Sequence, residues 1–209
     1  MTRIKCCGMT CVEDALLAAR LGADAIGLVF TARSKRRVDI AQARTIRRAL
    51  PPFVTAVALF MDDEAALVDE VIAQVRPDFL QFHGNEANGW CARFDRPWLK
   101  AVAMGEGMAA LPRLDDYPDA TGLLLDGHAA GEAGGSGKSF DWTLLPGDLV
   151  QPVVLAGGLH AGNVAAAIRA ARPWAVDVAS GVEAAPGRKD AAKLRAFIAA
   201  VRAADAAAA

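Results

Sequence analysis

The chain of 209 residues lacks the features that mark several large classes of protein. No apolar run approaches the roughly 18 residues that a membrane-spanning helix needs, and the segment up to Gly8 contains no apolar signal sequence. Charge of one sign is not in excess either, since 23 Lys and Arg residues stand against 24 Asp and Glu residues. Nothing therefore favours an anionic membrane or a nucleic acid as partner. We expect a cytoplasmic protein that binds neither.

Cysteine is scarce and is not spaced for a metal. The four cysteines (Cys6, Cys7, Cys11 and Cys91) form no C-x-x-C pair, which is the usual spacing of structural zinc ligands. Cys6 and Cys7 are adjacent, and neighbours in a strand point to opposite faces, so they would not bind one ion together. We therefore predict free thiols in a reducing compartment and no metal site.

The residues that are present form a repeating pattern. Hydrophobic residues make up 54% of the chain and charged residues 22%, which is a globular composition. Short runs of Val, Ile, Leu and Phe alternate with longer amphipathic stretches, which is typical of βα units and a parallel sheet. Strands are predicted at 3–7, 25–30, 54–60, 79–83, 98–102, 122–126, 152–156 and 175–179. Helices are predicted at 10–21, 40–50, 63–75, 86–94, 107–114, 161–171 and 190–203, with a short turn near Trp142.

The number of these units predicts the fold. Eight units in 209 residues leave about 26 residues for each, close to the minimum for a strand, a helix and two turns. Eight parallel strands are also the number that closes into a barrel. We predict a TIM (β/α)8 barrel of the α/β class, a single domain over residues 1–209 with 204–209 as a frayed tail. A doubly wound open sheet is the alternative.

Two strand ends carry residues suited to acid and base chemistry. In a (β/α)8 barrel the active site lies at the carboxyl ends of the strands. Alternation turns Cys7 into the mouth of the barrel, whereas Ile4 and Cys6 face the helices. Asp126 follows three leucines, and burial there would raise the pKa of its carboxyl group. A thiol and a carboxyl group facing each other across the mouth could act as base and acid.

Glycine-rich segments after later strands predict a phosphate site. Gly157-Gly158 follows the seventh strand and Ser180-Gly181 the eighth, and these two loops often bind phosphate in such barrels through backbone N–H groups. A third glycine loop covers 134–138 and ends like a nucleotide-binding P-loop. That motif needs its first glycine where Glu132 stands, so we do not predict a nucleoside triphosphate site.

Seven short motifs follow one another along the chain. They are Lys5-Cys6-Cys7-Gly8-Met9-Thr10, Gln81-Phe82-His83-Gly84, Leu125-Asp126, Gly135-Ser136-Gly137, Leu155-Ala156-Gly157-Gly158-Leu159, Asp177-Val178-Ala179-Ser180-Gly181-Val182-Glu183 and Pro186-Gly187-Arg188-Lys189-Asp190. Together they resemble one enzyme family, phosphoribosylanthranilate isomerase of tryptophan biosynthesis, and the resemblance runs from residue 3 to about residue 200. Its most specific parts are the opening K-x-C-G-x-T and the ending D-V-x-S-G-V-E-x-x-P-G-x-K-D.

The resemblance implies an aldose–ketose isomerase that carries out an Amadori rearrangement without metal or organic cofactor. In that family the cysteine matching Cys7 is the general base and the aspartate matching Asp126 the general acid. The arginine matching Arg36 holds the anthranilate carboxylate. A helix that begins at Thr10, where Thr10 and Glu13 form a capping box, would favour the thiolate of Cys7. The implied partner is a small phosphorylated substrate, and the enzyme would be a monomer or a homodimer.

Some assignments stay open at this stage. His83 could contact the substrate or simply end a strand, and Asp177 could bind ribulosyl hydroxyls or neutralise Lys5 inside the barrel. Arg36 could be a solvated charge in a basic loop. Two other functions compete: a histidine-pathway isomerase that uses two aspartates, and a non-catalytic barrel that binds phosphate ligands. Neither accounts for a cysteine at the end of the first strand.

Overall fold

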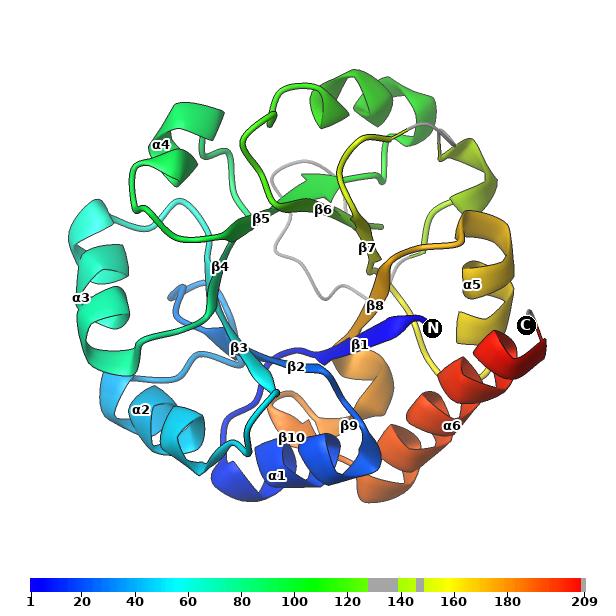
Figure 1. Ribbon diagram of the computed structural model, residues 1–209, viewed down its shortest axis with the longest axis horizontal. Helices are drawn as coiled ribbons and strands as arrows, with labels where there is room; N and C mark the ends of the chain where they lie inside the picture. Colours follow the sequence, from blue (N-terminus) through cyan, green and yellow to red (C-terminus); the bar gives the residue numbers. More distant parts are fainter. Residues whose placement is uncertain (128–138, 146–148, 208–209) are drawn as a thin grey trace.

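Eight parallel strands pair in chain order, and the last pairs with the first, so the sheet closes into a barrel (Figure 1). The computed structural model describes residues 1–127, 139–145 and 149–207. The predicted (β/α)8 barrel is confirmed, and the open sheet is wrong. The barrel strands are β1 (Arg3–Cys6), β2 (Ala25–Val29), β3 (Thr55–Phe60), β4 (Phe79–Phe82), β5 (Trp98–Ala103), β6 (Gly122–Asp126), β7 (Val153–Leu155) and β8 (Ala175–Val178).

Helices surround the barrel on its outer side (Figure 1). The α-helices are α1 (Val12–Leu21), α2 (Ile40–Ala49), α3 (Ala65–Val75), α4 (Asn88–Ala92), α5 (Val164–Ala171) and α6 (Ala191–Ala207). The more tightly wound 3-10 helices are η1 (Gly107–Leu114), η2 (Trp142–Leu144) and η3 (Ser180–Val182). The weak helical pattern after β5 thus forms a 3-10 helix.

Side chains along each strand alternate between the apolar core under the helices and the inside of the barrel. Ile4 and Cys6 of β1 are fully buried in the large apolar core of the protein, whereas Lys5 and Cys7 are inward-facing positions on the same stretch of chain. Much of the core between β2–β5 and the helices is aromatic. The ring of Phe60 is stacked on Phe30 at 5.5 Å and tilted against Phe82 at 6.1 Å, centroid to centroid. Burying one such side chain contributes about 1.5–3 kcal/mol.

The first helix begins later than the sequence indicates. α1 begins at Val12 behind Cys11, and no side chain caps it, so the predicted start at Thr10 with a capping box to Glu13 is wrong. The Thr10 hydroxyl instead donates to the carbonyl of Gly187, 2.5 Å away. A contact with a segment far along the chain has replaced the local cap.

The last helix extends through most of the predicted tail. α6 runs to Ala207, so the expectation of a frayed tail is wrong for residues 204–207, while 208–209 lie outside the described residues. The Asp205 carboxylate accepts hydrogen bonds from the N–H and hydroxyl of Thr2, at 3.0 and 2.7 Å. Ala204 is buried. These contacts order the helix against the beginning of β1.

A small hairpin after β8 was not predicted. β9 (Glu183–Ala185) and β10 (Arg188–Lys189) pair in antiparallel fashion, and Gly187 adopts a positive φ of 81° between them. Its Cβ-less backbone lies beside Thr10, the residue that hydrogen-bonds it. The hairpin therefore joins the end of β8 to the end of β1, at the mouth of the barrel.

Candidate active site

A cavity of about 340 Å³ opens at the carboxyl ends of the strands. It is the place where the sequence predicts the active site. Eight of the nine predicted site residues line it: Cys7, Arg36, His83, Asp126, Gly157, Gly158, Asp177 and Ser180. Only Gly181 does not.

Cys7 comes directly after β1 and continues its ladder. Its N–H donates to the carbonyl of Val178 at 2.8 Å, and its side chain lines the cavity. Cys6 is fully buried in the core instead. The prediction that alternation turns Cys7, and not Cys6, toward the mouth is confirmed.

The surroundings of Cys7 act on its thiol in opposite directions. Burial raises the pKa of Cys7 and is the largest effect, the ammonium groups of Lys5 and Lys189 lower it, and Asp177 raises it. The net result is a pKa above the ordinary thiol value. Since α1 begins only at Val12, these two buried lysines take the part that the sequence assigned to a helix end at Thr10.

Lys5 and Asp177 form an ion pair inside the barrel, with Nζ and Oδ1 2.9 Å apart and both side chains nearly buried. Burial lowers the pKa of Lys5, but Asp177 and Cys7 together raise it above its usual value. Lys5 is therefore a permanent cation. Asp177 neutralises Lys5 and also lines the cavity, so its two alternative roles are compatible.

Asp126 faces the cavity beside His83. The Nε2 atom of His83 lies 3.5 Å from Asp126 Oδ2, and Gln81 Nε2 lies 3.1 Å from His83 Nδ1. An amide nitrogen can only donate, so Nδ1 accepts and the proton of the neutral ring is on Nε2, toward Asp126. Gln81 and His83 thus orient a donor at the carboxyl group of Asp126.

Arg36 is held by a second carboxylate. Its Nε and Nη2 donate to Oε1 and Oε2 of Glu183, at 2.8 and 2.7 Å. Its aliphatic stem lies on Gly8, where an added Cβ would stand 2.4 Å from Arg36 Cδ. Gly8 has a positive φ of 74°. The alternative of a freely solvated Arg36 is therefore wrong.

The two glycine loops after β7 and β8 meet at the cavity. Gly157 and Gly158 have positive φ values of 84° and 61°, which glycine adopts without strain. A Cβ at Gly181 would stand 1.9 Å from the carbonyl oxygen of Leu159. Gly181 therefore lets the two loops approach each other, although it does not itself line the cavity. The third glycine loop, 134–138, lies outside the described residues.

Three residues near the site were not assigned a role from the sequence: Gln81, Glu183 and Lys189. Glu183 and Lys189 lie in the ending motif of the family that the sequence resembles, which was the signal available.

Among the residues that the structure describes, no group of three or more His, Cys, Asp or Glu side chains could hold a metal ion. No helix in the described ranges is long and apolar enough to span a bilayer. The cavity thus combines a thiol, a carboxyl group and glycine loops that could bind an anion.

Known proteins resemble this chain over nearly its whole length. A family model described as N-(5'phosphoribosyl)anthranilate (PRA) isomerase matches residues 4–200. The N-(5'-phosphoribosyl)anthranilate isomerase of Pseudomonas paraeruginosa is 56% identical over 200 residues, covering 96% of this chain and 95% of that protein.

Solved structures give the same result. The phosphoribosyl anthranilate isomerase from Thermotoga maritima is 40% identical, with a TM-score of 0.90 and coverage of 97% of this chain and 100% of that one. Another such isomerase is 37% identical, with a TM-score of 0.87 and the same coverage. It was crystallised in complex with reduced 1-(o-carboxyphenylamino)-1-deoxyribulose 5-phosphate.

Proposed function

This chain belongs to the N-(5'-phosphoribosyl)anthranilate isomerase family, and we propose that Cys7 and Asp126 divide the two proton transfers of the reaction between them. The protein isomerises N-(5'-phosphoribosyl)anthranilate to 1-(2-carboxyphenylamino)-1-deoxyribulose 5-phosphate, an aldose–ketose rearrangement in tryptophan biosynthesis. The observation that carries the assignment of roles is the presence of both side chains in one cavity.

Asp126 acts first, as the general acid. It gives its proton to the furanose ring oxygen, the bond from that oxygen to C1 breaks, and the nitrogen lone pair forms a Schiff base. Asp126 is left as a carboxylate. His83 lies 3.5 Å from that carboxylate through Nε2, and an N–H directed at the new negative charge stabilises it.

Cys7 acts second, as the general base. Its thiolate takes the proton from C2, and the electrons of that C–H bond move into the Schiff base to give an enolamine. The enolamine then moves a proton from its C2 hydroxyl to C1 and becomes the ketone, so that product and substrate are isomers. Cys7 releases its proton to solvent and Asp126 takes one up, which restores both groups for the next turnover. Each of the two transfers contributes roughly 10²–10⁴-fold to the rate.

The remaining residues bind and orient. Backbone N–H groups of Gly157 and Gly158, with the Ser180 side chain, hold the phosphate, and Gly181 lets the two loops approach each other. Arg36 holds the anthranilate carboxylate. Asp177 and His83 contact the sugar hydroxyls. Supporting this division, the glycine loops follow β7 and β8, which is the usual phosphate position of the fold.

The reaction also determines which cofactors and partners the enzyme needs. The chemistry consists of proton transfers and so needs neither metal nor organic cofactor. The partner is a small phosphorylated metabolite rather than nucleic acid or membrane, and we place the enzyme in the cytoplasm. It works as a monomer or a homodimer; a Thermotoga maritima relative is described as dimeric.

One assay tests these roles. Conversion of N-(5'-phosphoribosyl)anthranilate is followed by the loss of anthranilate fluorescence, with the wild type, Cys7→Ser and Asp126→Asn side by side. Turnover by the wild type and its near-complete loss in both variants is the expected result. Full activity in Cys7→Ser would reject Cys7 as the base, and full activity in Asp126→Asn would reject Asp126 as the acid.

A further inference from the structure

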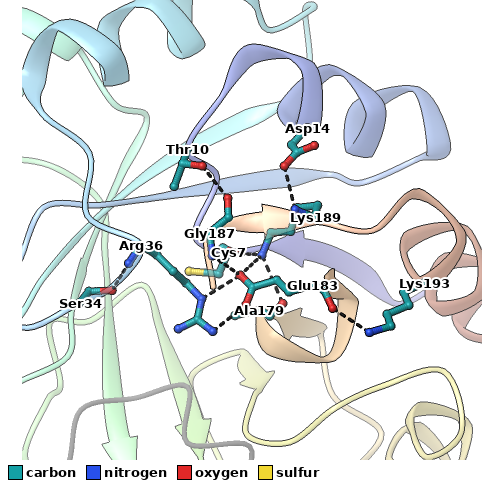
Figure 2. Close-up of polar contacts among 10 residues, drawn as sticks. All are labelled: Cys7, Thr10, Asp14, Ser34, Arg36, Ala179, Glu183, Gly187, Lys189 and Lys193. Carbon is teal, nitrogen blue, oxygen red and sulfur yellow. Dashed lines mark hydrogen bonds and ion pairs between the residues drawn. The ribbon is translucent and has the colours of Figure 1, made fainter. Parts of the chain in front are cut away.

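A cluster of charged side chains lies beside the thiol of Cys7, and of its members the reaction above uses only Arg36 (Figure 2). Its centre is the carboxylate of Glu183, at the start of the hairpin after β8. Around it are Arg36 from the loop after β2 and Lys189 from β10. The side chains of Glu183 and Lys189 are 5% and 0% exposed. Burying charged groups this deeply costs desolvation energy, which a functional role would explain.

Glu183 fixes the guanidinium of Arg36. Two parallel bonds, from Nε and Nη2, form the planar fork that best holds an arginine in one orientation. They leave Nη1 of Arg36 for another acceptor. Arg36 itself lines the cavity, and Figure 2 shows the guanidinium extending past Glu183, with one terminal nitrogen directed away from it.

Lys189 links the same carboxylate to the backbone beside the thiol. Its Nζ lies 2.8 Å from Glu183 Oε1 and 2.6 Å from the carbonyl oxygen of Cys7. A third contact, of 3.2 Å, goes to the carbonyl of Ala179. Lys189 thus joins the ends of β1 and β8, the two strands at the seam of the barrel.

Other contacts keep the hairpin in place. The Lys189 N–H donates to Asp14 of α1 at 2.8 Å, and Lys193 of α6 donates to the carbonyl of Glu183 at 2.7 Å. Figure 2 shows these bonds approaching the cluster from different directions. The carboxylate is therefore fixed on elements that are themselves packed on the barrel.

The charge of the cluster suits an anionic ligand. Burial raises the pKa of Glu183, but the hydrogen bond from Arg36 and the charge of Lys189 outweigh it and hold the pKa below the usual carboxyl value. Glu183 is therefore ionised at neutral pH. One anion between two cations leaves a single positive charge, which Arg36 can direct to an incoming carboxylate.

We propose that Glu183 is a positioning residue for the isomerisation: it sets Arg36 for the carboxylate of the substrate, and Lys189 extends the same restraint to the backbone of Cys7. The proposal rests on the roles given above to Arg36 and Cys7. A purely structural ion pair would also stabilise the fold, but it would have no preference for ligands that carry an anthranilate carboxylate. That preference separates the two interpretations.

The first experiment compares two competitive inhibitors of the turnover assay. Reduced 1-(o-carboxyphenylamino)-1-deoxyribulose 5-phosphate carries the carboxylate, and ribulose 5-phosphate does not. In Glu183→Gln, which keeps the shape and removes the charge, the inhibition constant of the first should rise about tenfold, the usual scale for a charged hydrogen bond. That of ribulose 5-phosphate should stay within about twofold. An equal rise for both, or no rise for either, would overturn the proposal.

A second arm tests whether Glu183 acts through Arg36. In an Arg36→Lys background, the further change Glu183→Gln should no longer weaken the carboxylate-bearing inhibitor, since a lysine cannot form the fork. An undiminished effect in that background would contradict the proposal.

Lys189→Met should lower kcat by about tenfold or more while KM changes little, because it frees the Cys7 backbone. An unchanged kcat, or a rise in KM alone, would contradict that arm.

Stability is controlled separately. Asp205→Asn removes a carboxylate that accepts three hydrogen bonds from Thr2, at the opposite end of β1. It should lower the unfolding free energy without changing either inhibition constant. If Glu183→Gln does not fold, Glu183→Asp keeps the charge but is one carbon too short to form both bonds. It should weaken the carboxylate-bearing inhibitor selectively, and an unselective effect would again overturn the proposal. Absence of turnover in the wild type would instead reject the proposed function.

Discussion

The sulfur of Cys7 lies against the α-carbon of Gly27 on the neighbouring strand. A Cβ added at Gly27 would stand 2.6 Å from Cys7 Sγ and 3.0 Å from Cys7 Cα. Glycine weakens a strand interior and often marks a close approach of another group. Gly27 is therefore the space into which the thiol fits.

Gly27→Ala should reduce kcat by about 100-fold, because a displacement of about 1 Å in a reacting group has that effect. The protein should still fold, since alanine is otherwise acceptable in a strand. Loss of anthranilate fluorescence measures the rate, and circular dichroism the fold. Gly89→Ala is the control, because a Cβ there meets nothing within 4 Å. Normal activity in Gly27→Ala would show that the thiol has another place to sit.

Cys6 and Cys7 offer a matched pair of substitutions. Cys7→Ser should lose activity by roughly 10²–10⁴-fold, the contribution of a general base, with little loss of stability. Cys6→Ser should keep its activity but lose about 1–3 kcal/mol, because it buries a hydroxyl in the apolar core. Urea unfolding and turnover measured on both variants test this. The reverse pattern would make Cys6 the base.

Alkylation of Cys7 should depend on pH in a particular direction. Burial holds its pKa above the ordinary thiol value, so the rate of reaction with iodoacetamide should reach half its maximum above about pH 8.5. The urea-unfolded chain should titrate near that ordinary value. Mass spectrometry of the peptide containing Cys7 measures both. A midpoint below that of the unfolded chain would mean that Lys5 and Lys189 outweigh burial.

The raised pKa of Cys7 should make the folded protein less stable as the pH rises. The folded state binds the Cys7 proton more tightly than the unfolded state does. Its contribution is therefore complete below the ordinary thiol pKa and is lost as pH rises through the folded value. Cys6 and Cys91, whose pKa burial raises to about 12, act in the same direction at more alkaline pH.

Lys100 should be important for stability rather than for the reaction. Its Nζ lies 2.7 Å from Glu86 Oε2, and the two side chains are 1% and 3% exposed. Lys100→Met leaves a buried carboxylate without its cation and should cost about 3–5 kcal/mol in urea unfolding. Arg47→Met, which breaks a half-exposed pair with Asp78, should cost at most about 1 kcal/mol. Equal losses in the two variants would contradict this reasoning.

Gly181→Ala should weaken phosphate binding. The added methyl would overlap the Leu159 carbonyl oxygen, so the loops after β7 and β8 must move apart. The constant for competitive inhibition by inorganic phosphate should rise about tenfold, as for loss of a charge-assisted hydrogen bond. Gly89→Ala again serves as control. An unchanged inhibition constant would place the phosphate elsewhere.

Much of the fold could be predicted because its pattern is local. Short apolar runs mark each strand to within a residue or so, and eight of them imply closure. Several predicted strands extend one residue too far at the carboxyl end, as at Cys7 and His83. Each of these residues still donates one backbone hydrogen bond to the neighbouring strand but already lines the cavity. The frayed tail was wrong because Asp205 is ordered by Thr2, at the other end of the chain.

Much of the site was predictable because polar residues and glycine loops follow the strands. Cys7 and Asp126 stand out because a polar side chain follows an apolar run. Glu183 and Lys189 do not, because their partners Arg36 and Cys7 lie 147 and 182 positions away. No short segment of the sequence contains both members of either pair. The missing cap at Thr10 has the same origin, since its hydroxyl bonds the distant Gly187.

The seam between β1 and β8 has a consequence for how the enzyme is made. A ribosome makes the N-terminal side of a domain first, so Cys7 is synthesised before the residues that surround it. The strand that pairs with β1, and the lysine that binds the Cys7 carbonyl at residue 189, are made much later. The thiol proposed as the base therefore acquires its surroundings only after residue 189 has been made, and a product that ends before that residue would carry the cysteine without them.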